Sequence, residues 1–176
     1  MKSTNLFVIA VLVFFLNFQT SYSAYASEFA PLPDHLSCLD QNNEALPVEN
    51  AQVIQWKVNT PDQTLKRALI QGTVTQVYND HTGHSHFAIN IDDRPSGDIE
   101  VIYNDEFGAL PAIQVGMSVI ACGDYITVGP HAHLPSPMGA IIHWVHYNPG
   151  NRDGGAHKSG FLIINGKPYG ATAPRM

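Results

Sequence analysis

Residues 72–104, GTVTQVYNDHTGHSHFAINIDDRPSGDIEVIYN, carry the pattern that decides the fold. Within them, residues 85–92 alternate strictly: Phe87, Ile89 and Ile91 fall on one side of an extended chain, and polar or small residues fall on the other. Segments 72–78 and 98–104, both with β-branched residues, flank this stretch, and turn-forming residues separate the three. The pattern predicts three consecutive strands with Phe87, Ile89 and Ile91 in the core.

Three further strands are predicted downstream, over residues 118–128, 140–147 and 161–165. Residues 106–115 are broken by Gly108 and Pro111 and read as a short connector, and Gly123 marks a bulge or bend. Three strands, a connector and then two or three more are typical of a small OB-like barrel with five strands in a Greek key. We therefore expect a mainly β protein with a five- or six-stranded barrel over residues 70–170. A β-sandwich is the alternative.

The first 26 residues have the form of a secretory signal peptide. Lys2 precedes an almost wholly apolar run, residues 6–18, and Ala24-Tyr25-Ala26 supplies small residues at the cleavage site. A membrane anchor is the alternative, but the apolar run of about 13 residues is shorter than the roughly 20 that span a bilayer. We expect cleavage after Ala26, a secreted or periplasmic protein, and no membrane attachment after cleavage.

Removing the leader leaves 150 of the 176 residues, which is enough for one domain with a real core. Residues 27–69 are expected to form an N-terminal arm with one short helix, residues 48–58, that carries Trp56 near its edge. A second helical turn is predicted over residues 64–68, and residues 171–176 are a short tail.

The two cysteines, Cys38 and Cys122, are expected to form a disulfide, because an exported protein meets an oxidising compartment. Two buried free thiols are the alternative. Neither cysteine belongs to a C-x-x-C pair, so a redox-active dithiol is not indicated.

The charge balance disfavours generic nucleic-acid binding. Without Lys2 the chain has 8 basic and 15 acidic residues, and the basic residues are scattered along it. A protein that binds phosphate backbones without sequence preference needs clustered cations to neutralise them. The expected partner is a small ligand or a metal ion.

Eight of the nine histidines lie between His81 and His157 and form three sets. His84 and His86 lie two apart with His81 nearby, so on a strand they face one side, which suits a metal ion; a solvated polar face is the alternative. His131 and His133 repeat the spacing in a proline-rich loop, where exposed histidines are the usual explanation.

The third set, His143, His146 and His157, is the main candidate for a metal site. Residues three apart in a regular strand face opposite sides, so His143 and His146 can share an ion only if the strand bulges or ends between them. The alternative is that His143 is a hydrogen-bonded core residue and the loop histidines are solvated. Neutral imidazoles are good ligands for zinc or copper, and the remaining ligand-binding candidates are Trp144, Tyr147, Asn148 and Arg152.

The block HWVHYNP at residues 143–149, followed by His157 and the Gly160-Phe161 pair, resembles a family of small secreted bacterial proteins known only as a domain of unknown function. That family carries H-W-T-H-x-D-P, then a histidine, then G-W or G-F. The resemblance covers roughly residues 70–170 and implies an OB-like barrel without an established activity. Val145 and Asn148 depart from the block, and Asn148 replaces a possible carboxylate ligand.

Three functions remain open from the sequence. The first is an exported binding module with a histidine-rich site for a transition metal or a small ligand. The second is a metal-dependent hydrolase using His143, His146 and His157. The third is a structural or protein-interaction domain without a small-molecule site. The sequence contains no H-E-x-x-H, G-x-S-x-G or glycine-rich phosphate loop that would indicate a particular enzyme class.

Overall fold

The computed structural model describes residues 32–60, 65–80, 82–128, 136–148, 150 and 157–172. The predicted leader, the start of the arm, most of the tail, His81, His131, His133 and Arg152 lie outside these residues. The described elements are one helix, two 3-10 turns and seven strands: α1 (Asn50–Asn59), β1 (Lys66–Val77), β2 (His84–Asn90), η1 (Pro95–Gly97), β3 (Asp98–Asn104), η2 (Asp105–Phe107), β4 (Ser118–Thr127), β5 (Ala140–His143), β6 (Phe161–Ile164) and β7 (Lys167–Tyr169).

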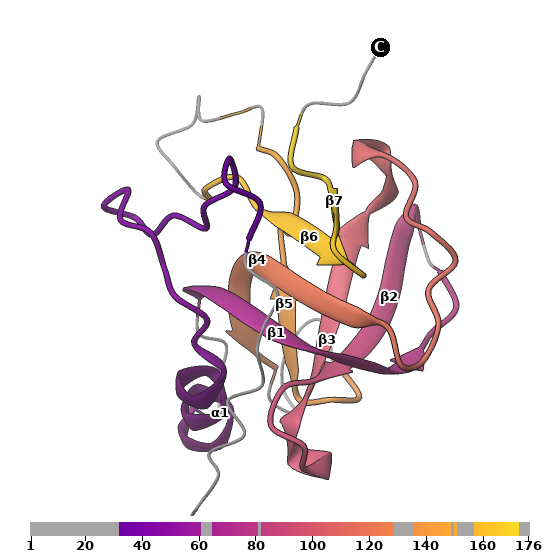
Figure 1. The fold of residues 1–176 in the computed structure, drawn as a ribbon. Helices are drawn as coiled ribbons and strands as arrows, with labels where there is room; N and C mark the ends of the chain where they lie inside the picture. The colour runs from indigo at the N-terminus through magenta and orange to yellow at the C-terminus, as the bar shows by residue number, and fades with distance from the viewer. Residues whose placement is uncertain are drawn as a thin grey trace, which may run out of the picture.

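Five of the strands close into a barrel in the order β1-β2-β3-β5-β4, with β4 pairing back onto β1 (Figure 1). Strands β3 and β5 run parallel, and the other pairs in the ring are antiparallel. This is the closed five-stranded arrangement expected of an OB-like barrel. The predicted fold class is confirmed and the β-sandwich alternative is wrong.

The barrel interior contains the core that the alternating stretch predicted. Phe87, Ile89 and Ile91 are buried and pack with residues from all five barrel strands. The third strand has the predicted bounds, 98–104.

The first strand is longer than predicted and begins at Lys66, so the helical turn predicted over residues 64–68 is wrong. Its early residues, Lys66–Thr73, pair with β4. Ala68 and Ile70 pack in the barrel core, whereas Leu69 packs in a second cluster on the other face. Because both faces are covered, this part of the strand has no polar alternation to reveal it.

The N-terminal arm covers that second face and is held there by a disulfide. Cys38 and Cys122 are bonded, with their Cα atoms 5.6 Å apart, as the cysteine count predicted. Arm residues Leu32, Leu36 and Leu46 pack against the buried residues around the disulfide. Figure 1 shows the arm beside β1 and β6.

Helix α1 begins two residues later than predicted. It buries Val53 and Ile54, and the ring of Trp56 lies 5.6 Å from that of Tyr125 in β4. No helix among the described residues is long and apolar enough to cross a membrane.

Strand β7 was not predicted. It pairs with β6 across Asn165 and Gly166, whose φ angles of 47° and 81° fit the tight turns that match hairpin twist.

Candidate functional site

A pocket of about 320 Å³ opens at one end of the barrel and brings four histidines together. We call it the four-histidine pocket. Its lining residues come from the start of β2, the end of β3, η2, the chain after β5 and the chain before β6: His84, Asn104, Glu106, Phe107, His143, Trp144, His146, Asn148 and His157.

The strand arrangement explains why these segments meet. Strand β3 pairs antiparallel with β2, with His84 opposite Asn104, so the start of β2 and the end of β3 share one end of the barrel. Strand β5 runs parallel to β3, so it ends there too, at His143. Three segments that are distant in sequence therefore deliver their polar side chains to one place.

The fifth strand stops at His143, four residues earlier than predicted. Trp144 has a φ of 51°, in the left-handed region that bulky residues rarely adopt, so the extended chain turns there. Val145 then points into the core, and His146 returns to the pocket with His143. The condition for His143 and His146 to share a site, a strand that ends between them, is met.

Close backbone contacts bring His157 to the same place. Strands β5 and β6 lie along one edge of β4, and a Cβ atom on Gly160 would lie 2.2 Å from the Trp144 carbonyl oxygen. The Gly160 N–H donates to the His146 carbonyl at 2.7 Å. Gly123 also allows a close backbone contact, because a Cβ atom there would lie 2.4 Å from the His143 carbonyl oxygen. On its other edge, β4 pairs with β1 in a regular register across Gly123. The β1–β4 pairing therefore has no bulge at Gly123, and the alternative, a bend there, stays a prediction.

Aromatic side chains hold two of the imidazoles by stacking. The Trp144 and His157 rings are 3.9 Å apart with planes inclined by 16°, and the Phe107 and His146 rings are 3.8 Å apart and inclined by 13°. His143 lies beside Trp144, with ring centres 4.4 Å apart, and 6.2 Å from the His84 ring. The stacked pairs reduce the number of orientations that the His146 and His157 rings can adopt.

Backbone carbonyls determine which nitrogen of two pocket histidines carries the proton. His146 Nδ1 lies 2.9 Å from the Tyr147 carbonyl oxygen, and His84 Nδ1 lies 3.1 Å from that of Thr82. A carbonyl oxygen only accepts, so each Nδ1 must donate. In the neutral ring the other nitrogen, Nε2, then has a free lone pair.

A buried ion pair between Arg67 and Asp124 lies beside His157, and no pattern in the sequence predicted it. His157 Nδ1 lies 3.5 Å from Asp124 Oδ2 and makes no hydrogen bond to any residue that the structure describes. The other oxygen of Asp124 accepts from Arg67 at 3.0 Å.

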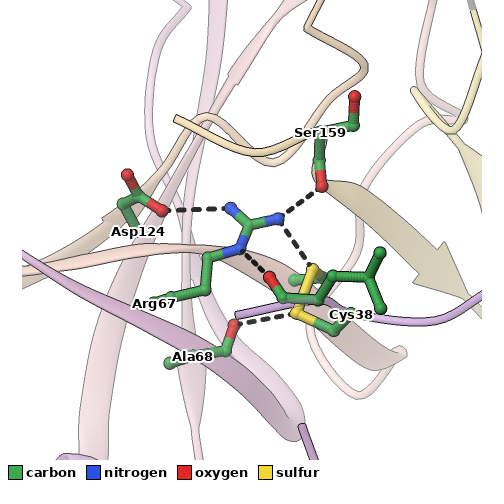
Figure 2. Close-up of a disulfide and its surroundings, with 7 residues drawn as sticks. Cys38, Arg67, Ala68, Asp124 and Ser159 are labelled. Atoms are coloured by element: carbon green, nitrogen blue, oxygen red, sulfur yellow. Dashed lines mark hydrogen bonds and ion pairs between the residues drawn. A yellow bond between two sulfur atoms is a disulfide. The ribbon is translucent and has the colours of Figure 1, made fainter. Parts of the chain in front are cut away.

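Arg67 contacts both Asp124, beside the pocket, and the disulfide (Figure 2). Its guanidinium donates to the carbonyls of Leu39 and Ser159, to Asp124, and to the sulfur of Cys122. It therefore joins the arm, β4 and the segment carrying His157.

Burial and crowding keep two of the imidazoles neutral. Burial lowers the pKa of His143 to about 4, and repulsion from the neighbouring histidines adds to the effect. Burial also lowers the pKa of His146, against the opposing effect of its bond to the Tyr147 carbonyl. Both rings are uncharged at neutral pH and can accept a hydrogen bond or bind a Lewis acid.

The pocket gathers most of the residues predicted for the site. His143, His146, His157, Trp144, Asn148 and the secondary candidate His84 line it. His86 lies outside its lining and contacts Glu100 at 2.9 Å. Tyr147 is also outside the lining, with its backbone N–H bonded to the Gly170 carbonyl.

The sequence did not point to Phe107, Asn104, Glu106, Asp124 or Arg67. Phe107 lies in the segment assigned as a connector. Asp124 and Arg67 lie on strands and act from behind the pocket.

Among the described residues, no three histidine, cysteine, aspartate or glutamate side chains are arranged as ligands of one metal ion. His84 and His143 approach each other, but the rings of His146 and His157 are stacked on aromatic neighbours. In this arrangement the imidazoles line a cavity and do not converge on a single point.

Comparison with known proteins gives no match: no protein-family model fits the chain, and no curated protein or solved structure is significantly similar to it. The resemblance of residues 143–161 to a domain of unknown function therefore stays a prediction.

Proposed function

We propose that this protein is a binding module whose ligand occupies the four-histidine pocket. The observation that carries the proposal is the convergence of four imidazoles from three chain segments in one cavity of about 320 Å³. A concave site with aromatic walls and a few convergent polar groups is the usual form of a small-molecule site. Perturbed pKa values, such as that of His143, also concentrate at functional sites.

A purely structural role explains this arrangement poorly. Gathering half-buried imidazoles that repel one another when protonated makes folding less favourable below neutral pH. His143 makes no side-chain hydrogen bond to any residue that the structure describes, so its ring is available to a ligand.

The geometry favours a small organic ligand over a metal ion, the two kinds that the sequence left open. A transition metal needs three or four ligand atoms about 2 Å from one point. No three histidine, cysteine, aspartate or glutamate side chains in the described part of the chain are placed in this way, so side chains would have to move to provide them. The metal-dependent hydrolase needs the same rearrangement and is supported less.

Zinc or copper remains a second candidate on one specific observation. His84 and His146 each donate Nδ1–H to a backbone carbonyl, the contact by which proteins orient metal-binding histidines. This leaves Nε2 of each ring free to coordinate.

We also propose that the protein is exported. The Cys38–Cys122 disulfide suits an oxidising compartment. The expectation that the protein does not bind nucleic acid generically rests on the charge balance of its sequence alone.

A fragment screen followed by protein-observed NMR tests the binding proposal. A diverse fragment library, zinc chloride and copper chloride are added separately to the purified protein, to His143→Phe and to His146→Ala. The exposed His35 provides the matched control, His35→Ala. We expect hits that shift the Trp144 and His146 resonances, bind the control normally and bind both pocket variants at least tenfold more weakly. Hits that bind all four proteins equally would contradict the proposal.

A further inference from the structure

The charged groups of the four-histidine pocket suggest what kind of ligand it takes. Histidines aside, Glu106 is the one lining residue within the described chain that carries a charge, and its side chain is exposed. No lysine or arginine lines the described pocket to oppose that negative charge.

The buried Arg67 is already fully engaged by the protein. Arg67 lies behind the pocket, and its three guanidinium nitrogens are engaged by Asp124, the disulfide and the carbonyls of Leu39 and Ser159. Its charge is matched by Asp124, and both side chains are nearly inaccessible to solvent, at 3% and 6% exposure. The pair adds no net positive charge to the pocket.

Two imidazoles of the lining offer hydrogen-bond acceptors. His84 and His146 use their Nδ1–H groups on backbone carbonyls, so in the neutral rings their Nε2 atoms are left as acceptors. The Asn148 side chain donates one N–H to the His157 carbonyl at 2.7 Å and accepts from the Gly150 N–H, so its second N–H can still donate to a ligand. The lining groups that can still donate are the Asn104 and Asn148 amides, the Trp144 indole N–H, His143 and His157.

We infer that the four-histidine pocket selects cationic groups that accept lone pairs or donate hydrogen bonds, and that it rejects anions at neutral pH. The inference rests on the proposed binding function. Two kinds of cation fit this description. One is an organic ammonium or guanidinium group, and the other is a transition-metal ion. Either would interact favourably with the Nε2 lone pairs and the Glu106 carboxylate. Among the described lining residues, an anion would meet a carboxylate and no fixed cation.

The test compares probes of opposite charge at pH 7.5, using NMR of the purified protein. n-Butylammonium and methylguanidinium chloride represent organic cations, and zinc chloride represents metal ions. Sodium butyrate and inorganic phosphate are the anions. We expect at least one class of cation to shift the Trp144 indole and His146 signals with a Kd at least tenfold below that of either anion.

Glu106→Gln is expected to weaken cation binding about 1.5- to 5-fold, the range for a solvent-exposed charge, whereas the exposed control Glu44→Gln leaves it unchanged. Zinc binding that is reversed by a chelator, without organic binding, assigns the metal source, and the converse assigns the organic source. Anions that bind as tightly as cations overturn the inference but leave the pocket a ligand site. If no probe shifts the pocket signals, the inference is wrong, and the fragment screen separately decides the binding proposal.

Discussion

Replacing Arg67 with methionine should destabilise the protein more than any comparable change to an exposed arginine. The change removes the partner of Asp124 from a position where the two side chains are 3% and 6% exposed and 3.0 Å apart. Removing one member of a buried ion pair leaves an uncompensated charge and typically costs about 3–5 kcal/mol. The variant also loses the hydrogen bonds to the Leu39 and Ser159 carbonyls, which join the arm and the His157 segment to the barrel.

Urea unfolding followed by circular dichroism, with the disulfide intact, measures this difference. Arg94→Met is the matched control: Arg94 pairs with Asp92 at 2.9 Å, but its side chain is 70% exposed, so the loss should be about 1 kcal/mol or less. Adding Asp124→Leu to Arg67→Met should recover much of the loss, because it removes the unpaired carboxylate. If Arg67→Met costs no more than Arg94→Met, the argument from the buried pair is wrong.

Three further predictions concern the site and its support. Gly160→Ala should lower the free energy of unfolding in urea by about 1–3 kcal/mol, because its Cβ would press on the Trp144 carbonyl. Gly150→Ala is the control, because the atom nearest to its added Cβ is 3.5 Å away, and equal losses in the two variants would refute the argument. Burial holds the His143 pKa at about 4 against 6.5 in the unfolded chain, so the unfolded state binds more protons between these values and stability falls as pH falls through them. His143→Gln should therefore shrink the drop in Tm between pH 7 and pH 4.5, and a drop as large as that of wild type or of His35→Gln would contradict this. Cys38→Ala should lower the unfolding free energy by about 4 kcal/mol, because the bond closes a loop with a sequence separation of 84; reduction that leaves stability unchanged would count against it.

The sequence predicted the parts of the fold in which one face of a strand is polar. The alternation around Phe87, Ile89 and Ile91 located the core of β2 and, with its flanking turns, the first three barrel strands. It missed the first half of β1, because Leu69 is buried under the arm while Ala68 and Ile70 are buried in the barrel. The burial of the second face of β1 depends on packing with the arm, which is distant in sequence, so the local pattern of apolar residues does not predict it.

The candidate site was predicted in part for a similar reason. The density of histidines identified the chain around His143 and His146, and the need for a strand end between them was clear from spacing alone. The place of that end was not, because Trp144 has the side chain of an ordinary strand residue and no local pattern marks its positive φ. Asp124 and Phe107 reach their places through strand register and the turn after β3, so no local motif marks them.

The most direct test of the central claim is to observe the histidine side chains during ligand binding. The purified protein, labelled with ¹³C and ¹⁵N in histidine only, is titrated with the tightest hit of the fragment screen. The account predicts that the signals of His84, His143, His146 and His157 shift together and saturate at one equivalent, while the signal of His35, on the arm, stays fixed. Saturation that leaves those four signals unmoved would contradict the claim that the four-histidine pocket is the ligand site.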